Sequence, residues 1–236
     1  MRTIGLVGGM SWESSAEYYR LLNTGVENRL GGLHSARIVM SSVEFAELTD
    51  AEQEGRWDDV ASVLTEAALG VEAAGADVLV LCTTTFHRVA GQVEAAVRIP
   101  LLHLADVVAD ACTRAGLGSV AFLGTAVAMS EPFFTERIAS HGLTVLVPDQ
   151  RHHAEIDQII YDELVFGKVA DRSRDRVVSV IDELWDQGAQ GVILGCTELE
   201  LLVKQADSEL PLFFCTPLHV AAALDAVLVG DGPAGR

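Results

Sequence analysis

Positive charge is scarce in this sequence, which has 16 Lys and Arg residues against 34 Asp and Glu, a formal net charge of −18. Proteins that bind nucleic acid or an anionic membrane need an excess of Lys and Arg to neutralise phosphates. The imbalance argues against both partners and leaves small molecules and proteins. An anionic substrate stays compatible with it, because backbone N–H groups and helix N-termini can bind a carboxylate locally.

Cysteine pairs, long apolar runs and metal-binding patterns are also missing. The four cysteines show neither CxxC spacing nor the density of a disulfide scaffold, and the seven histidines show no HExxH pattern. No apolar run reaches the ~18 residues of a membrane span. The first residues, MRTIGLVGGMS, enter a strand pattern without a signal segment, and they lack the lysine of a phosphate loop. We expect a cytoplasmic protein without a metal site.

The pattern that is present is an alternation of short apolar strands with longer helical segments. This alternation is typical of βαβ units around a mainly parallel sheet, and therefore of the α/β class. Ser14 and Glu17 form a capping-box pattern that predicts a helix start at about Ser14. The acidic residues around 44–59 are expected on a solvated helix face. Predicted strands cover 3–9, 36–45 and 77–82, and predicted helices cover 57–73 and 218–229, followed by a frayed tail at 230–236.

Two segments repeat at almost one offset. GADVLVLCTTT from Gly75 matches GAQGVILGCTE from Gly188, 113 residues apart, and the strand–glycine turns at Gly8 and Gly124 are 116 residues apart. We therefore predict two similar α/β lobes related by a pseudo-two-fold axis, each a mainly parallel sheet flanked by helices, with the site between them. The predicted lobes are residues 1–98 plus 209–236, with a closing C-terminal helix, and residues 99–208.

The repeat places Thr83 opposite Cys196, each just after a predicted strand. Reactive groups in open parallel sheets gather beyond the carboxyl ends of the strands. Cys196 is interpreted as a thiol acid/base or nucleophile whose pKa a helix N-terminus can lower, or else as a small buried hydrophobe. The hydroxyls of Thr83, Thr84, Thr85 and Thr125 fit donors to a substrate carboxylate or amino group, or partners of the turn backbone.

The other cysteines and the histidines are given plainer roles. Strand alternation points Cys82 away from the site, and Cys112 falls in a helical pattern, so both are predicted in the core. Cys215 ends another apolar run and fits a site wall or the core equally well. His87 is expected at a helix start near the site, and residues 152–153, a His-His pair, in a solvated loop.

Several motifs together resemble the aspartate/glutamate racemase family over nearly the whole chain: GLVGGMSWESSAEYYR, RLGGLHSA, SSVEF, LCTTTFH, LLHLAD, LGT and GCTELELLV. The resemblance implies a cofactor-independent isomerase with two α/β lobes, often a homodimer, that acts on amino acids. It implies that two groups on opposite faces of the α-carbon exchange the proton: Cys196 and, as in the most similar subgroup, a threonine at position 83. The implied substrate contacts are Met10, Ser11, Thr84, Thr85, Thr125, Thr197 and Glu198.

The chemistry of the two groups is unequal. A thiolate can act as a general base near neutral pH, whereas a threonine hydroxyl is too weak an acid to ionise there. Cys196 should take the proton readily from one enantiomer, and Thr83 should be a poor base toward the other. Thr84, Ala128 and Cys215 stand where the resembled family has Asn, Thr and Asp. These changes predict a less polar pocket, suited to a substrate bulkier or less acidic than aspartate, or a loss of activity.

Two alternatives to an aspartate or glutamate racemase remain. A decarboxylase of an activated malonate would need one cysteine, Cys196, opposite a pocket rich in hydroxyls, and would release carbon dioxide without racemisation. A binding or regulatory protein would keep the same amino-acid site and show no solvent exchange at the α-carbon.

Overall fold

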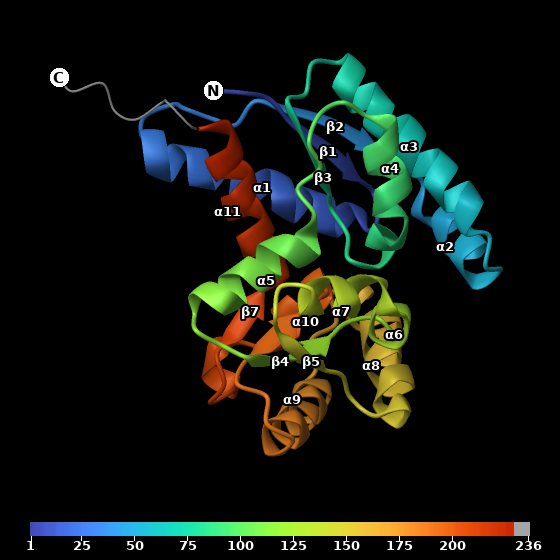
Figure 1. Ribbon diagram of the computed structural model, residues 1–236, viewed down its shortest axis with the longest axis vertical. Helices are drawn as coiled ribbons and strands as arrows, with labels where there is room; N and C mark the ends of the chain where they lie inside the picture. Colours follow the sequence, from blue (N-terminus) through green and yellow to red (C-terminus); the bar gives the residue numbers. More distant parts are fainter. Residues whose placement is uncertain (229–236) are drawn as a thin grey trace. The chain divides into compact units, whose positions relative to one another are not determined.

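The computed structural model describes residues 1–228, and the predicted tail at 230–236 lies outside them. The chain folds into two compact units (Figure 1), residues 1–103 with 219–228 as unit 1 and residues 104–218 as unit 2. Each contains a parallel sheet flanked by helices, which confirms the predicted fold class.

The sheet of unit 1 has the strand order β2-β1-β3, all parallel. Its strands are rich in Val, Ile and Leu, which suit a sheet that helices cover on both faces. Ile4 of β1 lies opposite Ile38 of β2 and Val78 of β3. An isolated bridge between Leu79 and Leu101 adds a further parallel segment beside β3. The strands are β1 (Ile4–Gly8), β2 (Ile38–Ser42) and β3 (Val78–Leu81).

Alternating side chains of this sheet enter two hydrophobic clusters. One face, with Leu6 and Val80, packs against α1 and α11, and the other, with Val7 and Leu81, packs against α2, α3 and α4. Burial of each Leu or Val side chain stabilises the folded unit by roughly 1.5–3 kcal/mol relative to leaving it exposed. The helical elements are α1 (Trp12–Leu30), α2 (Phe45–Gln53), α3 (Trp57–Ala73), η1 (Thr85–Val89), α4 (Ala90–Ala96) and α11 (Cys215–Val227).

The first helix begins earlier than the capping pattern predicted. α1 starts at Trp12, and Ser11 is its N-cap, with the Ser11 hydroxyl accepting from the Ser14 N–H at 3.3 Å. Ser14 is therefore inside the first turn. The acidic residues of α2 and the start of α3 are mostly exposed, as predicted for the segment 44–59.

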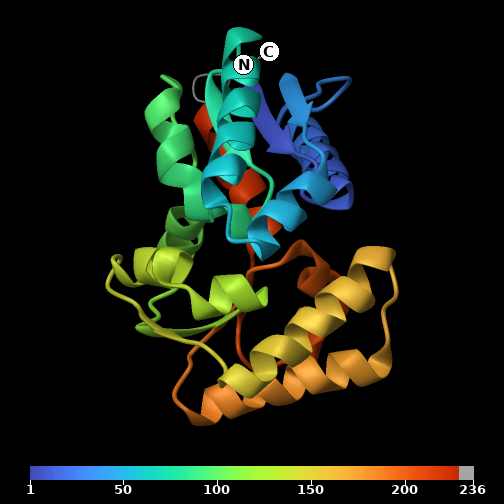
Figure 2. The same cartoon turned by 90° about the vertical axis from the view of Figure 1, so that its right-hand side faces the viewer.

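Unit 2 repeats the plan with the order β5-β4-β6-β7, again all parallel. Its strands and helices share one continuous hydrophobic core. α8 packs beside α9 (Figure 2). The elements are α5 (Leu104–Arg114), β4 (Ser119–Leu123), α6 (Ala126–Ser130), α7 (Pro132–Ala139), β5 (Thr144–Leu146), α8 (Gln150–Asp162), η2 (Leu164–Phe166), α9 (Asp171–Asp186), β6 (Val192–Leu194), α10 (Thr197–Leu202), η3 (Gln205–Asp207) and β7 (Leu212–Phe214).

The boundaries between the units differ from the predicted ones because of two pairings. The segment 209–218 was expected in the first lobe, but β7 pairs with β6 and so belongs to unit 2. The segment 99–103 was expected in the second lobe, but Leu101 bridges to β3 of unit 1. After each of these segments the chain enters a helix of the other unit, α5 in unit 2 and most of α11 in unit 1. No helix within residues 1–228 has the length and apolar character needed to cross a bilayer.

Candidate active site

In unit 1 the residues after β1 form a tight, buried turn. Gly9 has a φ of +95°, and its N–H donates to the Ser15 hydroxyl at 2.8 Å. An added Cβ on Gly9 would lie 2.3 Å from the Val43 carbonyl oxygen, so this turn needs glycine. Met10 and Ser11, both predicted substrate contacts, follow it and are buried, and Ser11 caps α1.

The threonine run follows β3, the strand next to β1, at the same carboxyl edge of the sheet. The Thr83 N–H donates to the Leu81 carbonyl at 2.9 Å, which turns the chain out of the strand. Thr83 and Thr84 are half-buried, and Thr85 is buried at the start of η1. The structure therefore brings Met10, Ser11 and the three threonines to one edge of unit 1.

In unit 2, Thr125 and Cys196 follow the paired strands β4 and β6. Thr125 is the N-cap of α6, and its hydroxyl accepts from the Ala128 N–H at 3.3 Å. The Gly195 N–H donates to the Leu123 carbonyl at 2.7 Å, which ties the two strand ends together. Thr125, Cys196, Thr197 and Glu198 thus share the carboxyl edge of this sheet.

The Cys196 thiol lies at that edge. Cys196 is the N-cap residue of α10 and is partly accessible, whereas the other three cysteines of the sequence are buried. Its Sγ donates a hydrogen bond to Oε2 of Glu198 at 2.9 Å. The structure therefore pairs a thiol with a carboxylate that can accept its proton.

The pKa of the Cys196 thiol is raised well above its ordinary value near 9.0. Burial is the largest cause, followed by the negative charge of Glu198 and its hydrogen bond. The backbone N–H groups of Glu198 and Leu199, at the start of α10, act in the opposite direction. The lowering effect of the helix N-terminus, which the sequence suggested, is therefore smaller than the raising effects of burial and Glu198. The resting group is a neutral thiol.

A second carboxyl, missed in the sequence, lies one helical turn beyond Cys196. Oε1 of Glu200 accepts from the Thr216 N–H at 2.9 Å, and the Thr216 and Thr197 hydroxyl oxygens are 3.4 Å apart. Burial raises the pKa of Glu200 to about 8, although hydrogen bonds from the backbone and the side chain of Thr216 to this carboxyl lower it. The i, i+4 spacing from Cys196 is a signal that could have placed Glu200 beside the site residues.

The other cysteines lie in the cores. Cys82 and Cys112 are fully buried, as predicted, and burial raises both pKa values, that of Cys112 to about 12. Cys215 is also buried, in the core of unit 2, and burial followed by the charge of Glu200 raises its pKa. Cys215 therefore packs as core, which was one of its two interpretations. Ala128, at the other apolar replacement, is buried too.

The solvated loop predicted for His152 and His153 is wrong. Both are buried in α8. His152 Nε2 is 3.1 Å from a carboxylate oxygen of Glu183 in α9, and its Nδ1 is 2.8 Å from the Arg176 guanidinium. His153 Nε2 donates to the Pro148 carbonyl at 2.8 Å. These partners are distant in sequence or lie in the loop before α8, so the pattern of the pair itself did not show them.

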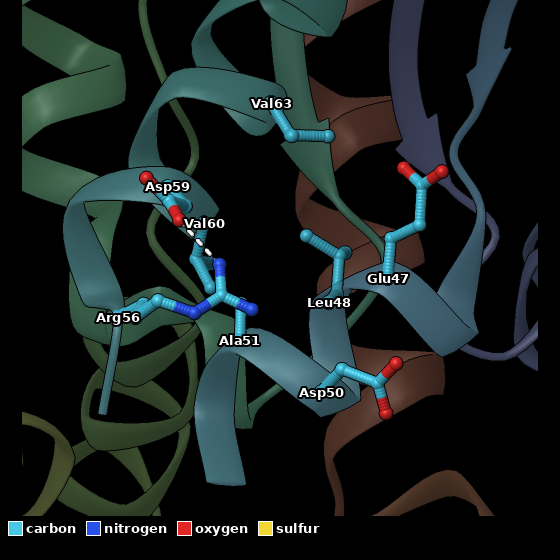
Figure 3. A pocket seen from close by; sticks show the side chains of 8 residues that line it. All are labelled: Glu47, Leu48, Asp50, Ala51, Arg56, Asp59, Val60 and Val63. Carbon is cyan, nitrogen blue, oxygen red and sulfur yellow. Dashed lines mark hydrogen bonds and ion pairs between the residues drawn. The ribbon is translucent and has the colours of Figure 1, made fainter. Parts of the chain in front are cut away.

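A cavity of about 300 Å³ lies elsewhere in unit 1, between α2 and α3 (Figure 3). Arg56 in its wall forms ion pairs with Asp59 and Glu54, so its charge is already balanced. None of the predicted site residues lines this cavity. Its lining residues are Glu47, Leu48, Asp50, Ala51, Arg56, Asp59, Val60 and Val63.

Each unit thus has a parallel sheet with polar side chains at its carboxyl edge, hydroxyls in unit 1 and hydroxyls with the Cys196 thiol in unit 2, which places the chain in the α/β class. Residues 7–223 match the Asp/Glu/Hydantoin racemase family. The chain belongs to this family, which confirms the predicted class of enzyme, a racemase.

Solved structures agree with this assignment. A Yersinia pestis protein provisionally classed as an Asp/Glu racemase is 43% identical, with 97% of this chain and 100% of that chain covered and a TM-score of 0.91. An aspartate racemase homologue from Pyrococcus horikoshii OT3 is 29% identical, covering 96% and 99%, with a TM-score of 0.84. Unliganded arylmalonate decarboxylase, 15% identical over 100% and 96% with a TM-score of 0.53, shares the fold alone.

Proposed function

We propose that this chain is a cofactor-independent racemase of aspartate or glutamate, in which Cys196 and Thr83 exchange the α-proton on opposite faces of the substrate. The observation that carries the proposal is Cys196, a partly buried residue at a strand end whose Sγ lies 2.9 Å from the Glu198 carboxylate. Membership of the racemase family supports the reaction type. The names of the Yersinia and Pyrococcus relatives support acidic amino acids as the substrate class.

The first half-reaction begins with proton transfer from the Cys196 thiol to Glu198. The resulting thiolate takes the α-proton, and the C–H electron pair stays on the substrate as a carbanion delocalised into its carboxylate. Donors that bind this carboxylate stabilise the growing charge. Those proposed are the backbone N–H of Met10 and the hydroxyls of Ser11, Thr84, Thr85, Thr125 and Thr197.

In the second half-reaction the Thr83 hydroxyl donates its proton to the opposite face of the α-carbon. The alkoxide takes a proton from water, and the hydroxide that remains takes the proton held by Glu198, so Cys196 keeps the α-proton and each group returns to its resting state. The reverse direction needs Thr83 as a base, for which a hydroxyl is poorly suited. Rates and saturation should therefore differ between the enantiomers. The equilibrium ratio of the enantiomers stays at one, because a catalyst cannot change it.

The test is an enantiomer-resolved assay of aspartate and glutamate in D₂O with purified protein and no added cofactor. We expect inversion with deuterium incorporation at the α-carbon, and its loss in Cys196→Ala. Cys112→Ala is the matched control, because Cys112 is buried in the core of unit 2 and should leave turnover in place. Full activity of Cys196→Ala, or no exchange with either enantiomer in the wild type, would remove the proposal.

Decarboxylation of an activated malonate is a second candidate. It is favoured by one observation, that Cys196 is the single accessible cysteine among the four. In that reaction the bond to a carboxyl group breaks, carbon dioxide leaves, and Cys196 protonates the carbanion. Carbon dioxide release from an arylmalonate, without exchange at the α-carbon of aspartate or glutamate, would decide for the decarboxylase.

A further inference from the structure

A cluster of buried imidazoles adjoins Thr83 in unit 1. His87, His103 and His219 are 3%, 6% and 0% exposed. The ring centroid of His87 lies 4.6 Å from that of His103 and 6.1 Å from that of His219. The three rings come from separate parts of the chain, η1, the segment before α5, and α11. The proposed proton-transfer steps do not use any of them.

The side chain of His87 is hydrogen-bonded to the backbone carbonyl of Thr83. The backbone N–H of His87 donates to the Thr84 carbonyl at 3.1 Å, the i to i−3 hydrogen bond of a 3₁₀ turn. It therefore does not donate to the carbonyl of Thr83, as it would in an α-helix. The ring supplies the missing donor, since Nδ1 of His87 lies 2.7 Å from the Thr83 carbonyl oxygen. A carbonyl can only accept, so Nδ1 carries the hydrogen. This bond fixes the peptide group that joins Thr83 to Thr84.

The neighbouring ring of His219 is held on both sides. Its Nε2 donates to the Leu102 carbonyl at 2.8 Å, and its Nδ1 accepts from the Tyr18 hydroxyl at 2.9 Å. Burial lowers the pKa of His219 to about 4, so this ring is neutral near pH 7. A rigid ring from α11 therefore supports the His87 ring, and through it the end of β3.

We propose that His87 is a positioning residue for Thr83, and that its ring, held among His103 and His219, sets the direction of the Thr83 hydroxyl. The inference rests on the proposed racemase function. The imidazole cluster should affect only the half-reaction that uses Thr83. The other half-reaction uses Cys196, which belongs to unit 2 and is hydrogen-bonded to Glu198 there. Misplacement of a reacting group by about 1 Å can cost on the order of 100-fold in rate.

The two half-reactions can be separated in D₂O. For the enantiomer whose α-hydrogen faces the thiol, Cys196 alone can remove the proton and return deuterium, so exchange without inversion does not require Thr83. Inversion requires Thr83 in either direction. The ratio of inversion to exchange without inversion therefore reports on Thr83 alone, and a general loss of folded protein leaves this ratio unchanged.

The experiment compares His87→Leu, His87→Asn and Phe86→Leu in the full chain. Leu removes the donor, whereas the side-chain amide of Asn places an N–H close to the position of Nδ1. Phe86→Leu is the matched control, because Phe86 is buried beside His87 and packs on Phe45 and Trp57. We expect His87→Leu to lower inversion by about tenfold or more, with exchange at the Cys196 face changed less than about threefold.

His87→Asn should return the ratio to within about threefold of the wild type, and Phe86→Leu should leave it unchanged. Equal losses of inversion and exchange in His87→Leu, or an Asn variant as impaired as the Leu variant, would overturn the positioning role while leaving the racemase proposal intact. A wild type without any exchange would overturn both.

Discussion

At the scale of one residue, the Cys196 thiol is subject to opposing electrostatic effects. The N–H groups at the start of α10 stabilise a thiolate, while burial and the neighbouring carboxylate of Glu198 disfavour it and win. A resting thiol is protected from ionisation until its proton can pass to Glu198. The carboxylate therefore has two effects, since it raises the thiol pKa and also offers the acceptor for the proton.

Replacing Glu198 with Gln should separate these effects. The amide removes the negative charge, so the pKa of Cys196 should fall toward its ordinary value, while racemisation should drop by about tenfold or more because the proton acceptor is lost. The rate of alkylation by iodoacetamide against pH measures the thiol directly, since the other cysteines are buried. Glu209→Gln, at an exposed position of unit 2, is the control. An alkylation midpoint that stays in place or moves to higher pH would contradict this account.

At the scale of one element, the turn from β6 into α10 depends on the absence of a side chain at Gly195. A Cβ there would lie 2.4 Å from Cε2 of Phe122 and 3.1 Å from the Leu123 carbonyl oxygen. Phe122 is fully buried, so its ring has little room to move. The close approach of the β4 and β6 strand ends sets the position from which Cys196 starts α10.

We expect Gly195→Ala to lower the free energy of unfolding by about 1–3 kcal/mol through overpacking and to reduce turnover further by displacing Cys196. Gly70→Ala is the matched control. Gly70 lies in α3 with nothing within 4 Å of its added Cβ, so alanine there should stabilise the helix by roughly 0.5–1 kcal/mol. Urea unfolding and the racemisation rate measure both variants. If Gly195→Ala proved as stable and active as the wild type, the steric argument would be wrong.

At the scale of the whole molecule, two buried groups link stability to pH with opposite signs. Glu200 keeps its proton in the native state up to about pH 8, while an unperturbed carboxyl releases it near 4.5. The native state binds more protons in that range, so stability falls as the pH rises through it. His219 titrates at about 4 in the native state against an ordinary 6.5, so stability falls as the pH drops from 6.5 toward 4.

Glu200→Gln should remove the alkaline part of this dependence. The amide oxygen can still accept from the Thr216 N–H, but no charge has to be buried as the pH rises. The difference in unfolding free energy between the variant and the wild type, from urea titrations at several pH values, should therefore shift in favour of the variant between pH 5 and pH 9. A difference that does not change with pH would show that Glu200 titrates normally in the native state.

Much of the fold could be predicted from the sequence because strands and turns are determined largely by residues that are neighbours in the chain. The apolar runs of β1 and β3, the glycine turn after β1 and the repeat between the Thr83 and Cys196 segments can all be recognised from the order of residues in the sequence, without knowledge of the fold. Strand alternation likewise predicted Cys82 in the core, where the structure has it. The strand ends, and hence the candidate residues beyond them, could be named before the structure was known.

The sequence by itself determined the α/β class, the duplicated plan and the strand-end residues, because hydrophobic period and turn chemistry are written into neighbouring positions. Only the tertiary structure decided that Glu198 raises the pKa of Cys196 and that Glu200 is buried against Thr216. It also decided that His152 lies beside charged side chains of α9, and that the ring of His219 packs near the ring of His87. Burial, and the proton equilibria that burial controls, depend on partners brought together from distant positions in the chain, and only the packed fold specifies those partners.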